Sequence, residues 1–354
     1  MTVAPCVERP EQSVSGDRYH ALRVKRVVIE TDESRSIVFD VPAHLADRYS
    51  YRPGQFVTLR AVIDGNREVR SYSMSSAPSI DADLQVTVKR VPGGLVSNWL
   101  NDTVVEGDML DVSAPVGEFV LDDTDADIIA FCGGSGITPV FSIVKSALHE
   151  TDRDVRLLFA NRDRPSAIFG GVLDDLVARY PGRLEVLHHE DATDGLVDVD
   201  DVVAFLGGRR AASFYVCGPT GFMQVVGLGL RRSGIDDPHI RVERFTPMAA
   251  DSATADDATA DAATAITVTV TVGRQTRTVD QRGSSTILQT ARRSGLRAPS
   301  SCEAGHCATC MARVVEGAVQ MAKNDVLTPE ELREGWVLTC QAVPVTPVVR
   351  VVYE

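Results

Sequence analysis

The chain has 354 residues, of which 44% are hydrophobic and 24% charged, and its formal net charge is −13. This length exceeds one ordinary hydrophobic core and predicts two or three domains. No run approaches the roughly 20 apolar residues of a membrane span, and the negative charge disfavours nucleic acid and anionic membranes as partners, while it permits docking onto a basic protein patch. Residues 1–10 lack a basic start and an apolar run, so we expect a cytoplasmic protein without a secretory signal.

Short strands and turns dominate the first part of the chain, from about residue 20 to residue 119. Branched and aromatic residues are frequent at residues 22–27, 56–59 and 84–88. Turn-forming residues separate these segments at Pro53-Gly54, Asp64-Gly65 and Pro92-Gly93-Gly94. This pattern predicts an antiparallel β-barrel domain over residues 18–121.

Strands and helices alternate from Asp125 onward. Apolar strands are expected at residues 127–132, 155–160, 184–187 and 214–217. Helices are expected over residues 140–148, near residues 173–178 and from Phe222. Such alternation predicts a parallel sheet covered on both faces, an α/β domain over residues 122–246.

A change of composition separates a third domain from the rest. Residues from Ala249 to Ala265 are only Ala, Asp, Thr and Ser, so we expect a flexible linker over residues 247–265. A short Ala-rich helix is the alternative, which the interleaved Thr and Asp weaken. Beyond it, residues 266–272 alternate with period two, a helix is expected around Leu288, and residues 348–352 form a last strand. The third domain, residues 266–354, is therefore expected to be α+β.

Four of the seven cysteines are close to the carboxyl terminus. Cys302, Cys307 and Cys310 follow a C-x₄-C-x₂-C pattern, and Cys340 is a distant fourth. This is the spacing of plant-type [2Fe–2S] clusters. Small residues between the cysteines allow backbone N–H groups to point at the sulfurs and to help set the potential; they are Ala304, Gly305, Ala308 and Thr309.

Two other uses of these cysteines remain open. Structural zinc sites usually combine two close Cys pairs, whereas this segment has one. His306 is a further possible ligand, but four thiolates suffice for a cluster, and we expect His306 to face solvent. The last alternative is a set of buried, inert cysteines.

The segment from Arg70 to Ser73 carries three groups that a flavin requires. Arg70 offers a cation for the pyrophosphate, Tyr72 an aromatic plane for the ring, and Ser71 and Ser73 hydroxyl groups near the reactive N5 atom. An ordinary strand with alternating Tyr and Ser explains the same pattern when it is taken alone.

A second phosphate-binding element follows about twenty residues later. Gly94 opens an expected helix that contains Val96 and Ser97, and Lys89 with Arg90 adds positive charge before it. A glycine turn at a helix N-terminus is suited to a phosphate. The turn favours FAD over FMN, because FAD has a second phosphate.

A glycine-rich turn between a buried strand and a helix predicts a dinucleotide site. Its residues are Gly133, Gly134, Ser135, Gly136 and Thr138. A merely tight strand–helix turn is the alternative.

Cys217-Gly218-Pro219 ends another expected strand, and ligands of parallel sheets bind at the carboxyl ends of strands. The two segments are therefore expected to converge on one crevice.

Two residues near this crevice bear on its chemistry. Cys217 has no evident histidine partner that would activate a thiolate, so we interpret it as a contact to the nicotinamide. NADPH sites usually present Arg or Lys to the 2′-phosphate. Here Arg162 adjoins Asp163, which would repel a phosphate, and the sequence favours NADH, with NADPH as the alternative.

The order of these motifs over residues 20–245 resembles the ferredoxin–NADP reductase superfamily. The resemblance implies that the segment from Val242 to Phe245 closes the reductase part beside the flavin. It also implies catalytic or ring-positioning roles for four residues, namely Ser73, Cys217, Glu243 and Phe245. Residues 266–354 resemble plant-type ferredoxins, which have a β-grasp fold.

The whole chain resembles reductase components of oxygenases. That resemblance implies electron flow from NADH through FAD and a [2Fe–2S] cluster to a terminal oxygenase of the Rieske type, with the reductase a monomer. Within the group it is most similar to the reductases of 3-ketosteroid 9α-hydroxylases, which act in steroid degradation; Thr31 to Ser36, Ser97 to Leu100 and Asn324 to Leu327 are among the matches. Reductases of phenylacetyl-CoA epoxidases have the same layout. A redox-sensing module and a flavin reductase with a zinc-stabilised tail are the remaining alternatives.

Overall fold

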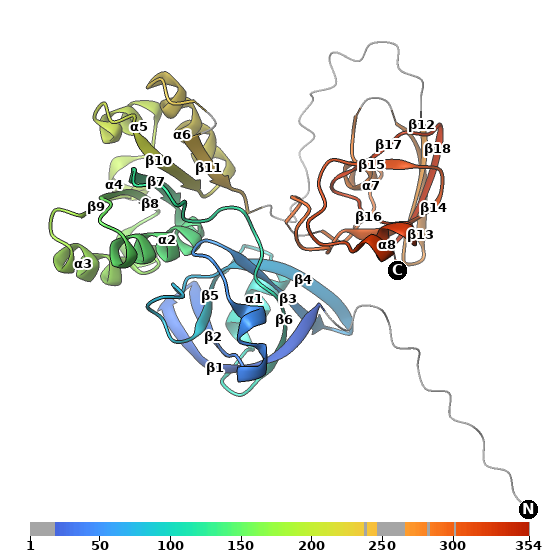
Figure 1. Ribbon diagram of the computed structural model, residues 1–354, viewed down its shortest axis with the longest axis horizontal. Coiled ribbons are helices and arrows are strands. Elements are labelled where there is room, and N and C mark those ends of the chain that lie inside the picture. Colours follow the sequence, from blue (N-terminus) through green and yellow to red (C-terminus); the bar gives the residue numbers. More distant parts are fainter. Residues whose placement is uncertain (1–17, 237–238, 246–265, 282–283, 301, 354) are drawn as a thin grey trace, which may run out of the picture.

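A computed structural model describes residues 18–236, 239–245, 266–281, 284–300 and 302–353. Figure 1 shows three domains in chain order: a barrel in blue, an α/β domain in green and yellow, and a C-terminal domain in orange and red. Their fold classes confirm the three that the sequence predicts. The expected linker, residues 247–265, lies outside the described residues.

The barrel domain is built from antiparallel strands in the order β4-β3-β6-β1-β2-β5. The sheet closes because Met74 bridges Val86, and the Ser75 amide donates to the Gln85 carbonyl at 2.9 Å. Helix α1 contributes Leu100 to the core inside the barrel. The elements are β1 (Tyr19–Thr31), β2 (Ser34–Asp40), η1 (Ala43–Leu45), η2 (Asp47–Tyr49), β3 (Phe56–Ile63), β4 (Asn66–Ser73), β5 (Leu84–Lys89), α1 (Leu95–Asp102) and β6 (Met109–Ser113).

The α/β domain has a parallel sheet in the order β11-β10-β7-β8-β9. Apolar side chains from both of its faces enter separate cores, one with α2 and α3 and the other with α5 and α6. The elements are β7 (Asp127–Gly133), η3 (Gly134–Gly136), α2 (Ile137–Glu150), β8 (Val155–Asn161), η4 (Arg164–Ser166), α3 (Gly170–Arg179), β9 (Leu184–Glu190), α4 (Asp191–Asp194), α5 (Val199–Leu206), β10 (Ala212–Cys217), α6 (Thr220–Arg232) and β11 (Ile240–Glu243).

The C-terminal domain has a mixed sheet in the order β13-β12-β18-β14-β16 and a short β15-β17 pair. Strands β12 and β18 are parallel, and α7 packs Ile287, Leu288 and Ala291 into the core beneath them. The elements are β12 (Ile266–Val272), β13 (Gln275–Gln281), α7 (Ile287–Arg293), β14 (Met311–Glu316), β15 (Val319–Met321), α8 (Pro329–Arg333), β16 (Trp336–Leu338), β17 (Ala342–Pro344) and β18 (Val348–Tyr353).

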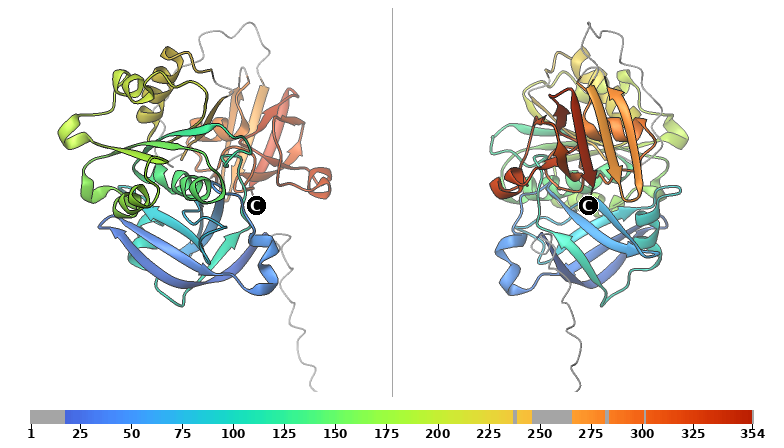
Figure 2. Two further views of the ribbon diagram at one scale, coloured as in Figure 1. Left: turned by 60° about the vertical axis from the view of Figure 1, so that its left-hand side comes forward. Right: turned by 90° about the vertical axis from the view of Figure 1, so that its right-hand side faces the viewer.

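The C-terminal domain lies beside both other domains. Figures 1 and 2 show it above the barrel and next to the α/β domain, and ion pairs join it to the barrel side. Its orientation determines which surface the cysteine loop faces.

Candidate functional site

Strand pairing brings the distant cysteine to the cysteine loop. Cys310 comes directly before β14, and Cys340 follows β16, which pairs with β14 through Met311 and Leu338. The Thr339 amide donates to the Cys310 carbonyl at 3.2 Å. The predicted four cysteines therefore converge, although 29 residues separate the last two along the chain.

The four sulfurs form two hydrogen-bonded pairs. A hydrogen bond from Cys307 lowers the pKa of the Cys302 thiol to about 5, and a hydrogen bond from Cys310 lowers the pKa of the Cys340 thiol. The hydrogen bond to the partner raises the pKa of the other thiol of each pair, Cys307 and Cys310, so each pair readily forms one thiolate, the form that binds iron. Two pairs match the two irons of a [2Fe–2S] cluster, each of which takes two cysteine ligands.

Backbone and side-chain donors surround these sulfurs. The Cys302 amide donates to Cys307 Sγ at 3.4 Å, the Ala304 amide to Cys302 Sγ at 3.4 Å, and the Gln341 amide nitrogen to Cys340 Sγ at 3.6 Å. The loop reaches this geometry through left-handed residues, which are Glu303, Gly305 and Ala308. Such donors stabilise negative charge on the sulfurs, as the small-residue pattern predicts.

The prediction that His306 faces solvent is wrong. The side chain is 8% exposed, and its Nδ1 lies 2.8 Å from Asp325 Oδ2. A contact from a loop about twenty residues later buries the imidazole, and the local sequence around the cysteines contains no signal for that contact.

The flavin motif lies on β4 beside β3, as its sequence predicts. Tyr72 pairs with Val57 and Ser73 with Phe56, so the motif ends at the edge of the barrel. Burial raises the pKa of the Tyr72 hydroxyl, so Tyr72 stays neutral. Ser71 Oγ lies 3.0 Å from Thr58 Oγ1, and Arg70 makes a 3.3 Å ion pair with Glu68 within the strand.

The glycine turn before α1 is tight and internally bonded. Gly94 caps the helix, and a Cβ there would lie 2.6 Å from Ser97 Oγ. That oxygen accepts a hydrogen bond from the Val91 amide at 3.1 Å, while Val96 is buried in the barrel core. The turn is thus held by its own hydrogen bonds, and its role in phosphate binding stays a prediction.

Lys89 brings the flavin and nicotinamide elements together. A Cβ on Gly134 would lie 3.7 Å from Lys89 Nζ, although the two residues belong to different domains. Gly134 has a φ of +52°, which favours glycine. Lys89, at the end of the strand before the Gly94 turn, therefore places a positive charge beside the predicted nicotinamide turn.

Three glycines allow the two nicotinamide segments to touch. A Cβ on Gly136 would lie 2.2 Å from the Cys217 carbonyl oxygen, and one on Gly218 would lie 2.9 Å from the Gly133 nitrogen. The prediction that these segments converge is confirmed. The hydroxyl of Thr138 donates to the Ser135 carbonyl at 3.0 Å and fixes the start of α2.

Two predicted cofactor residues are engaged with protein groups. Cys217 is fully buried, and burial raises the pKa of its thiol well above the usual value, which disfavours a thiolate. Arg162 lies 3.2 Å from Asp163 and 3.7 Å from Glu33, so two carboxylates compete for its charge. The second carboxylate comes from the barrel domain and adds to the one that the sequence indicates.

Glu243 and Phe245 lie where the α/β domain meets the cysteine loop. Glu243 ends β11 beside Cys217, and Phe245 packs against the α/β core. Burial, and then the charge of Cys302, raises the pKa of the Glu243 carboxyl to about 7. On the barrel side, burial and then the charge of Cys307 raise the pKa of Tyr19 to about 12. The cysteine loop therefore lies between residues of both reductase domains.

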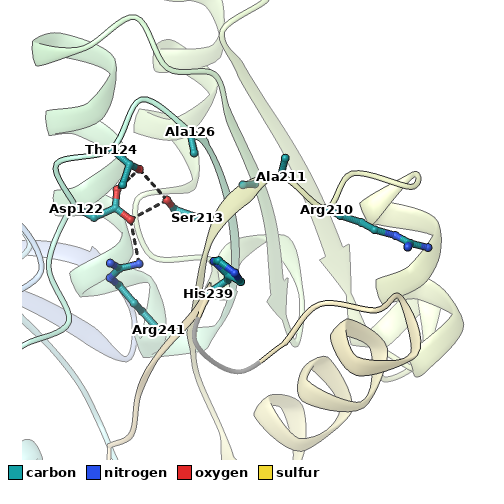
Figure 3. A pocket seen from close by; sticks show the side chains of 9 residues that line it. Asp122, Thr124, Ala126, Arg210, Ala211, Ser213, His239 and Arg241 are labelled. Atoms are coloured by element: carbon teal, nitrogen blue, oxygen red, sulfur yellow. Dashed lines mark hydrogen bonds and ion pairs between the residues drawn. The ribbon is translucent and has the colours of Figure 1, made fainter.

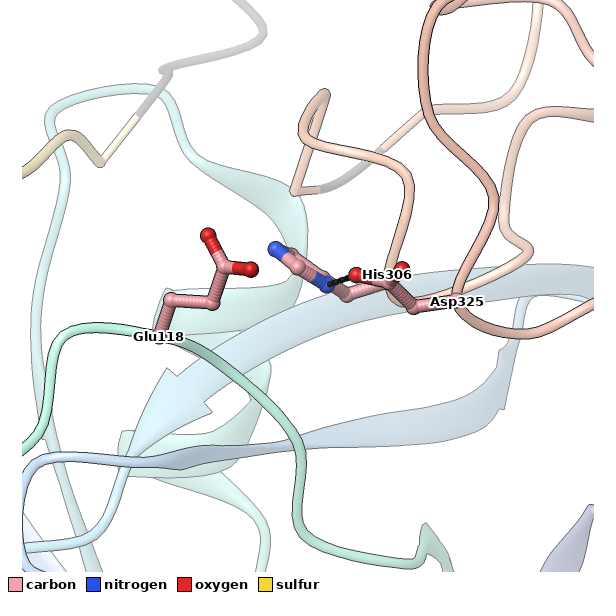
Figure 4. Close-up of side chains that lie close together, drawn as sticks. All are labelled: Glu118, His306 and Asp325. Atoms are coloured by element: carbon pink, nitrogen blue, oxygen red, sulfur yellow. Dashed lines mark ion pairs between the residues drawn. The ribbon is translucent and has the colours of Figure 1, made fainter.

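A polar cluster joins the cysteine loop to the segment between the barrel and the α/β domain. Figure 4 shows Glu118 facing His306, with Asp325 on the other side of the imidazole; their ligand atoms lie within 4.8 Å of one another. Lys323 Nζ lies 2.5 Å from Glu118 and 3.5 Å from Asp325. Because the ammonium of Lys323 already pairs with both carboxylates, the cluster favours ion pairing over metal binding. Sequence reasoning considered His306 but missed its contacts with Glu118 and Asp325 and the ion pairs of Lys323.

A cavity of about 420 Å³ lies at the opposite end of the α/β strands. Figure 3 shows Asp122 at one side of it, hydrogen-bonded to Ser213 near the start of β10 and paired with Arg241. The nicotinamide segments occupy the carboxyl ends of the same strands, so this cavity is separate from them. Its lining residues are Asp122, Thr124, Ala126, Arg210, Ala211, Ala212, Ser213, His239 and Arg241.

Family models match all three domains. The oxidoreductase FAD-binding domain matches residues 21–121, the oxidoreductase NAD-binding domain residues 131–227, and the 2Fe-2S iron-sulfur cluster binding domain residues 270–345. With the relatives below, these matches show that the chain belongs to the family of oxygenase reductases that combine FAD, NAD and [2Fe–2S] binding in one polypeptide. It is an oxidoreductase of the electron-transfer type.

Among the described residues, the helices are too short or too polar to cross a membrane.

The relatives are similar over nearly the whole chain. The ferredoxin reductase component of 3-ketosteroid-9-alpha-monooxygenase from Mycolicibacterium smegmatis is 41% identical over 96% of this chain and 98% of its own. One component of the 1,2-phenylacetyl-CoA epoxidase of Escherichia coli is 32% identical over 93% and 96%. The solved phthalate dioxygenase reductase, at 23% identity and TM-score 0.59, covers 95% of this chain and 98% of its own and supports the three-domain fold.

Proposed function

We propose that this chain is the NADH-dependent reductase of a 3-ketosteroid 9α-hydroxylase and that it delivers electrons to a terminal oxygenase of the Rieske type. The proposal rests on 41% identity to the reductase of such a system, against 32% to the epoxidase component. The convergence of the four cysteines, and the approach of Glu118 on the barrel side to His306 in their loop, carry the electron-transfer part of the proposal. A reductase of this kind would act as a monomer in the cytoplasm, where thiols stay reduced.

Bound FAD would turn the two-electron hydride of NADH into single electrons that a [2Fe–2S] cluster can carry. In this scheme Gly133 to Thr138 and Cys217 to Pro219 hold the dinucleotide, and Lys89 neutralises phosphate charge between the two domains. Tyr72 and Ser73 support the flavin ring at the end of β4. Glu243 and Phe245 close the site and exclude water beside the two rings.

The preference for NADH is part of the proposal. Arg162 is the cation that the sequence offers to a 2′-phosphate, and it is paired with Asp163 and Glu33. A 2′-phosphate would have to displace those carboxylates. We therefore expect a higher kcat/KM for NADH than for NADPH in a flavin-reduction assay, and equal values would contradict the preference.

The variant Cys307→Ser tests the electron route. Removing one thiolate should abolish or alter the cluster, so NADH should still reduce the flavin and artificial acceptors while transfer to the oxygenase is lost. The measurement is oxygenase turnover beside the rate of ferricyanide reduction. Full turnover in this variant would refute the route through the cluster.

Reconstitution tests the identity of the partner. Purified reductase would be combined separately with a 3-ketosteroid 9α-hydroxylase oxygenase and with a phenylacetyl-CoA epoxidase oxygenase, and product formation measured with NADH. We expect the steroid oxygenase to be supported more efficiently. Preference for the epoxidase would replace the steroid assignment with the second candidate.

A further inference from the structure

Two ion pairs connect the barrel side to the C-terminal domain, and the C-terminal domain supplies the cation in one and the anion in the other. Lys323 of the C-terminal domain lies 2.5 Å from Glu118, which belongs to the segment that follows the barrel. Arg18 at the start of the barrel pairs with Glu331 of α8. If the C-terminal domain docked in reverse, Lys323 would approach Arg18 and Glu331 would approach Glu118. Like charges would then oppose that orientation, so the two pairs specify one docking arrangement.

Glu118 is positioned rigidly with respect to the flavin strand. Two residues before it, Val116 exchanges backbone hydrogen bonds of 2.9 Å with Phe56 in both directions. Phe56 in turn pairs with Ser73, the last residue of the flavin motif. The backbone that carries Glu118 therefore has a fixed relation to the predicted flavin site.

Lys323 is linked to the cysteine loop through Asp325. Its ammonium also lies 3.5 Å from Asp325 Oδ2, and the same oxygen lies 2.8 Å from His306 Nδ1. His306 precedes the cluster ligand Cys307. A short chain of polar contacts thus connects Glu118 to the loop that would hold the cluster, as Figure 4 shows for three of its members.

The second pair is fixed at both ends as well. Glu331 uses one oxygen for Arg18 and the other to accept the Thr328 amide at 2.8 Å, which caps α8. The guanidinium of Arg18 also contacts Met311 Sδ at 3.5 Å, directly after the ligand Cys310. Both ion pairs therefore connect to residues adjacent to cluster ligands.

We propose that Lys323–Glu118 and Arg18–Glu331 form a releasable latch, which holds the C-terminal domain in the orientation that receives electrons from the flavin. The inference deepens the proposed function and rests on it. The Lys323–Glu118 half of the latch can open readily because Glu118 is 70% exposed, and an exposed ion pair contributes little to a domain contact. The Arg18–Glu331 half is 24% and 9% exposed, so it is the tighter of the two pairs. The latch controls orientation, since alternative arrangements bring like charges together.

The test uses the full-length protein loaded with FAD and the cluster. Anaerobic stopped-flow mixing with NADH would follow flavin reduction and cluster reduction separately. We expect Lys323→Met and Glu118→Gln each to slow flavin-to-cluster transfer about three- to ten-fold at low salt. Combining them should slow it no further, because each variant already removes the same contact. NADH should reduce the flavin at the unchanged rate in all three proteins.

A matched control uses an ion pair of the same domain that does not face the reductase. Arg350 and Glu316 join β18 to β14 at 3.5 Å, and both are more than half exposed. The pair of changes Arg350→Met and Glu316→Gln should leave flavin-to-cluster transfer at the native rate. A loss equal to that of the latch variants would point to a general effect of removing charge and would overturn the proposal.

Two other outcomes would also overturn it. Native transfer rates in Lys323→Met and Glu118→Gln at low salt would show that the pair does not control docking. Losses that multiply in the double variant would show that the two residues act independently. A measurement on the native protein distinguishes these results from failure of the proposed function. If NADH does not reduce the cluster of the native protein, the electron route itself is wrong.

Discussion

Gly136 lies where the two nicotinamide segments of the α/β domain meet. The glycine-rich turn suggests close approach of a ligand, but the structure shows that this residue first permits contact between two protein segments. An added Cβ would lie 2.2 Å from the Cys217 carbonyl oxygen, a distance that forces the backbone to move. A Cβ added to Gly134, by contrast, would meet only Lys89 Nζ within 4 Å among the described residues outside its chain neighbours. Neighbouring glycines of one motif therefore have different physical roles.

The variant Gly136→Ala should impair nicotinamide binding through this clash. We expect overpacking to cost about 1–3 kcal/mol of stability and to lower kcat/KM for NADH in flavin reduction. Gly221→Ala is the control, because a Cβ at Gly221 in α6 meets no atom within 4 Å in the described structure. Native kinetics in Gly136→Ala would mean that the segments separate without consequence.

At the scale of elements, Asp122 joins the segment after the barrel to the α/β sheet. Its side chain is 8% exposed and lies 2.9 Å from both Arg153 and Arg241. It also accepts a hydrogen bond from Ser213 at 2.7 Å. Burial opposes its ionisation, but the hydrogen bonds from Ser213 and Thr124 and the two guanidinium groups outweigh burial and lower the pKa of Asp122. The connection therefore depends on an ionised carboxylate.

The variant Asp122→Asn should destabilise the α/β domain by about 3 kcal/mol near neutral pH, because it leaves a buried arginine without its charge partner. The pKa of Asp122 is lowered in the folded state, so its stabilisation is present above the usual Asp value of about 3.9 and is lost as the pH falls through the lowered value. The difference between variant and native protein should accordingly shrink in acid.

Urea unfolding near neutral pH and in acid measures this effect. Asp123→Asn serves as the control, because the Asp123 side chain is 95% exposed and its pair with Arg52 spans 3.3 Å. That variant should lie within about 0.5 kcal/mol of the native protein. A loss in Asp122→Asn that persisted unchanged below the titration range would contradict the role of its charge.

At the scale of the whole molecule, contact between the domains makes cluster reduction an internal step. The cysteine loop lies against the barrel side, where Glu118 approaches His306 within 4.8 Å and Arg18 contacts Met311 at 3.5 Å. An acceptor on the same chain has a high effective concentration that dilution does not change. Electron transfer from flavin to cluster should therefore not require a second molecule.

We expect the rate constant of cluster reduction to stay constant when the protein concentration is raised about tenfold, since the step is intramolecular. Anaerobic stopped-flow with excess NADH, monitored at the cluster absorbance, measures it. Transfer to the separate oxygenase is the internal comparison, because its observed rate should rise with oxygenase concentration. Linear dependence of cluster reduction on reductase concentration would indicate transfer between chains.

Local patterns were sufficient to predict the three fold classes and the motifs. Each pattern arises within a few residues. Strand geometry produces the period-two alternation, and backbone freedom produces the glycine turns. The shape of a cluster-binding loop determines the spacing of Cys302, Cys307 and Cys310. The order of motifs also determined that Gly136 and Gly218 meet, because the carboxyl ends of parallel strands share one edge.

Only the tertiary structure decided which charges meet between domains. His306 was expected in solvent, yet Asp325 covers it, and Lys323 pairs with Glu118 from a part of the chain about two hundred residues earlier. A surface Lys or Glu has the same local sequence signature whether it faces water or another domain, because its partner is chosen by how the domains dock. The sequence by itself therefore determined the cofactor-binding parts, and docking determined the latch and the burial of the cysteine loop.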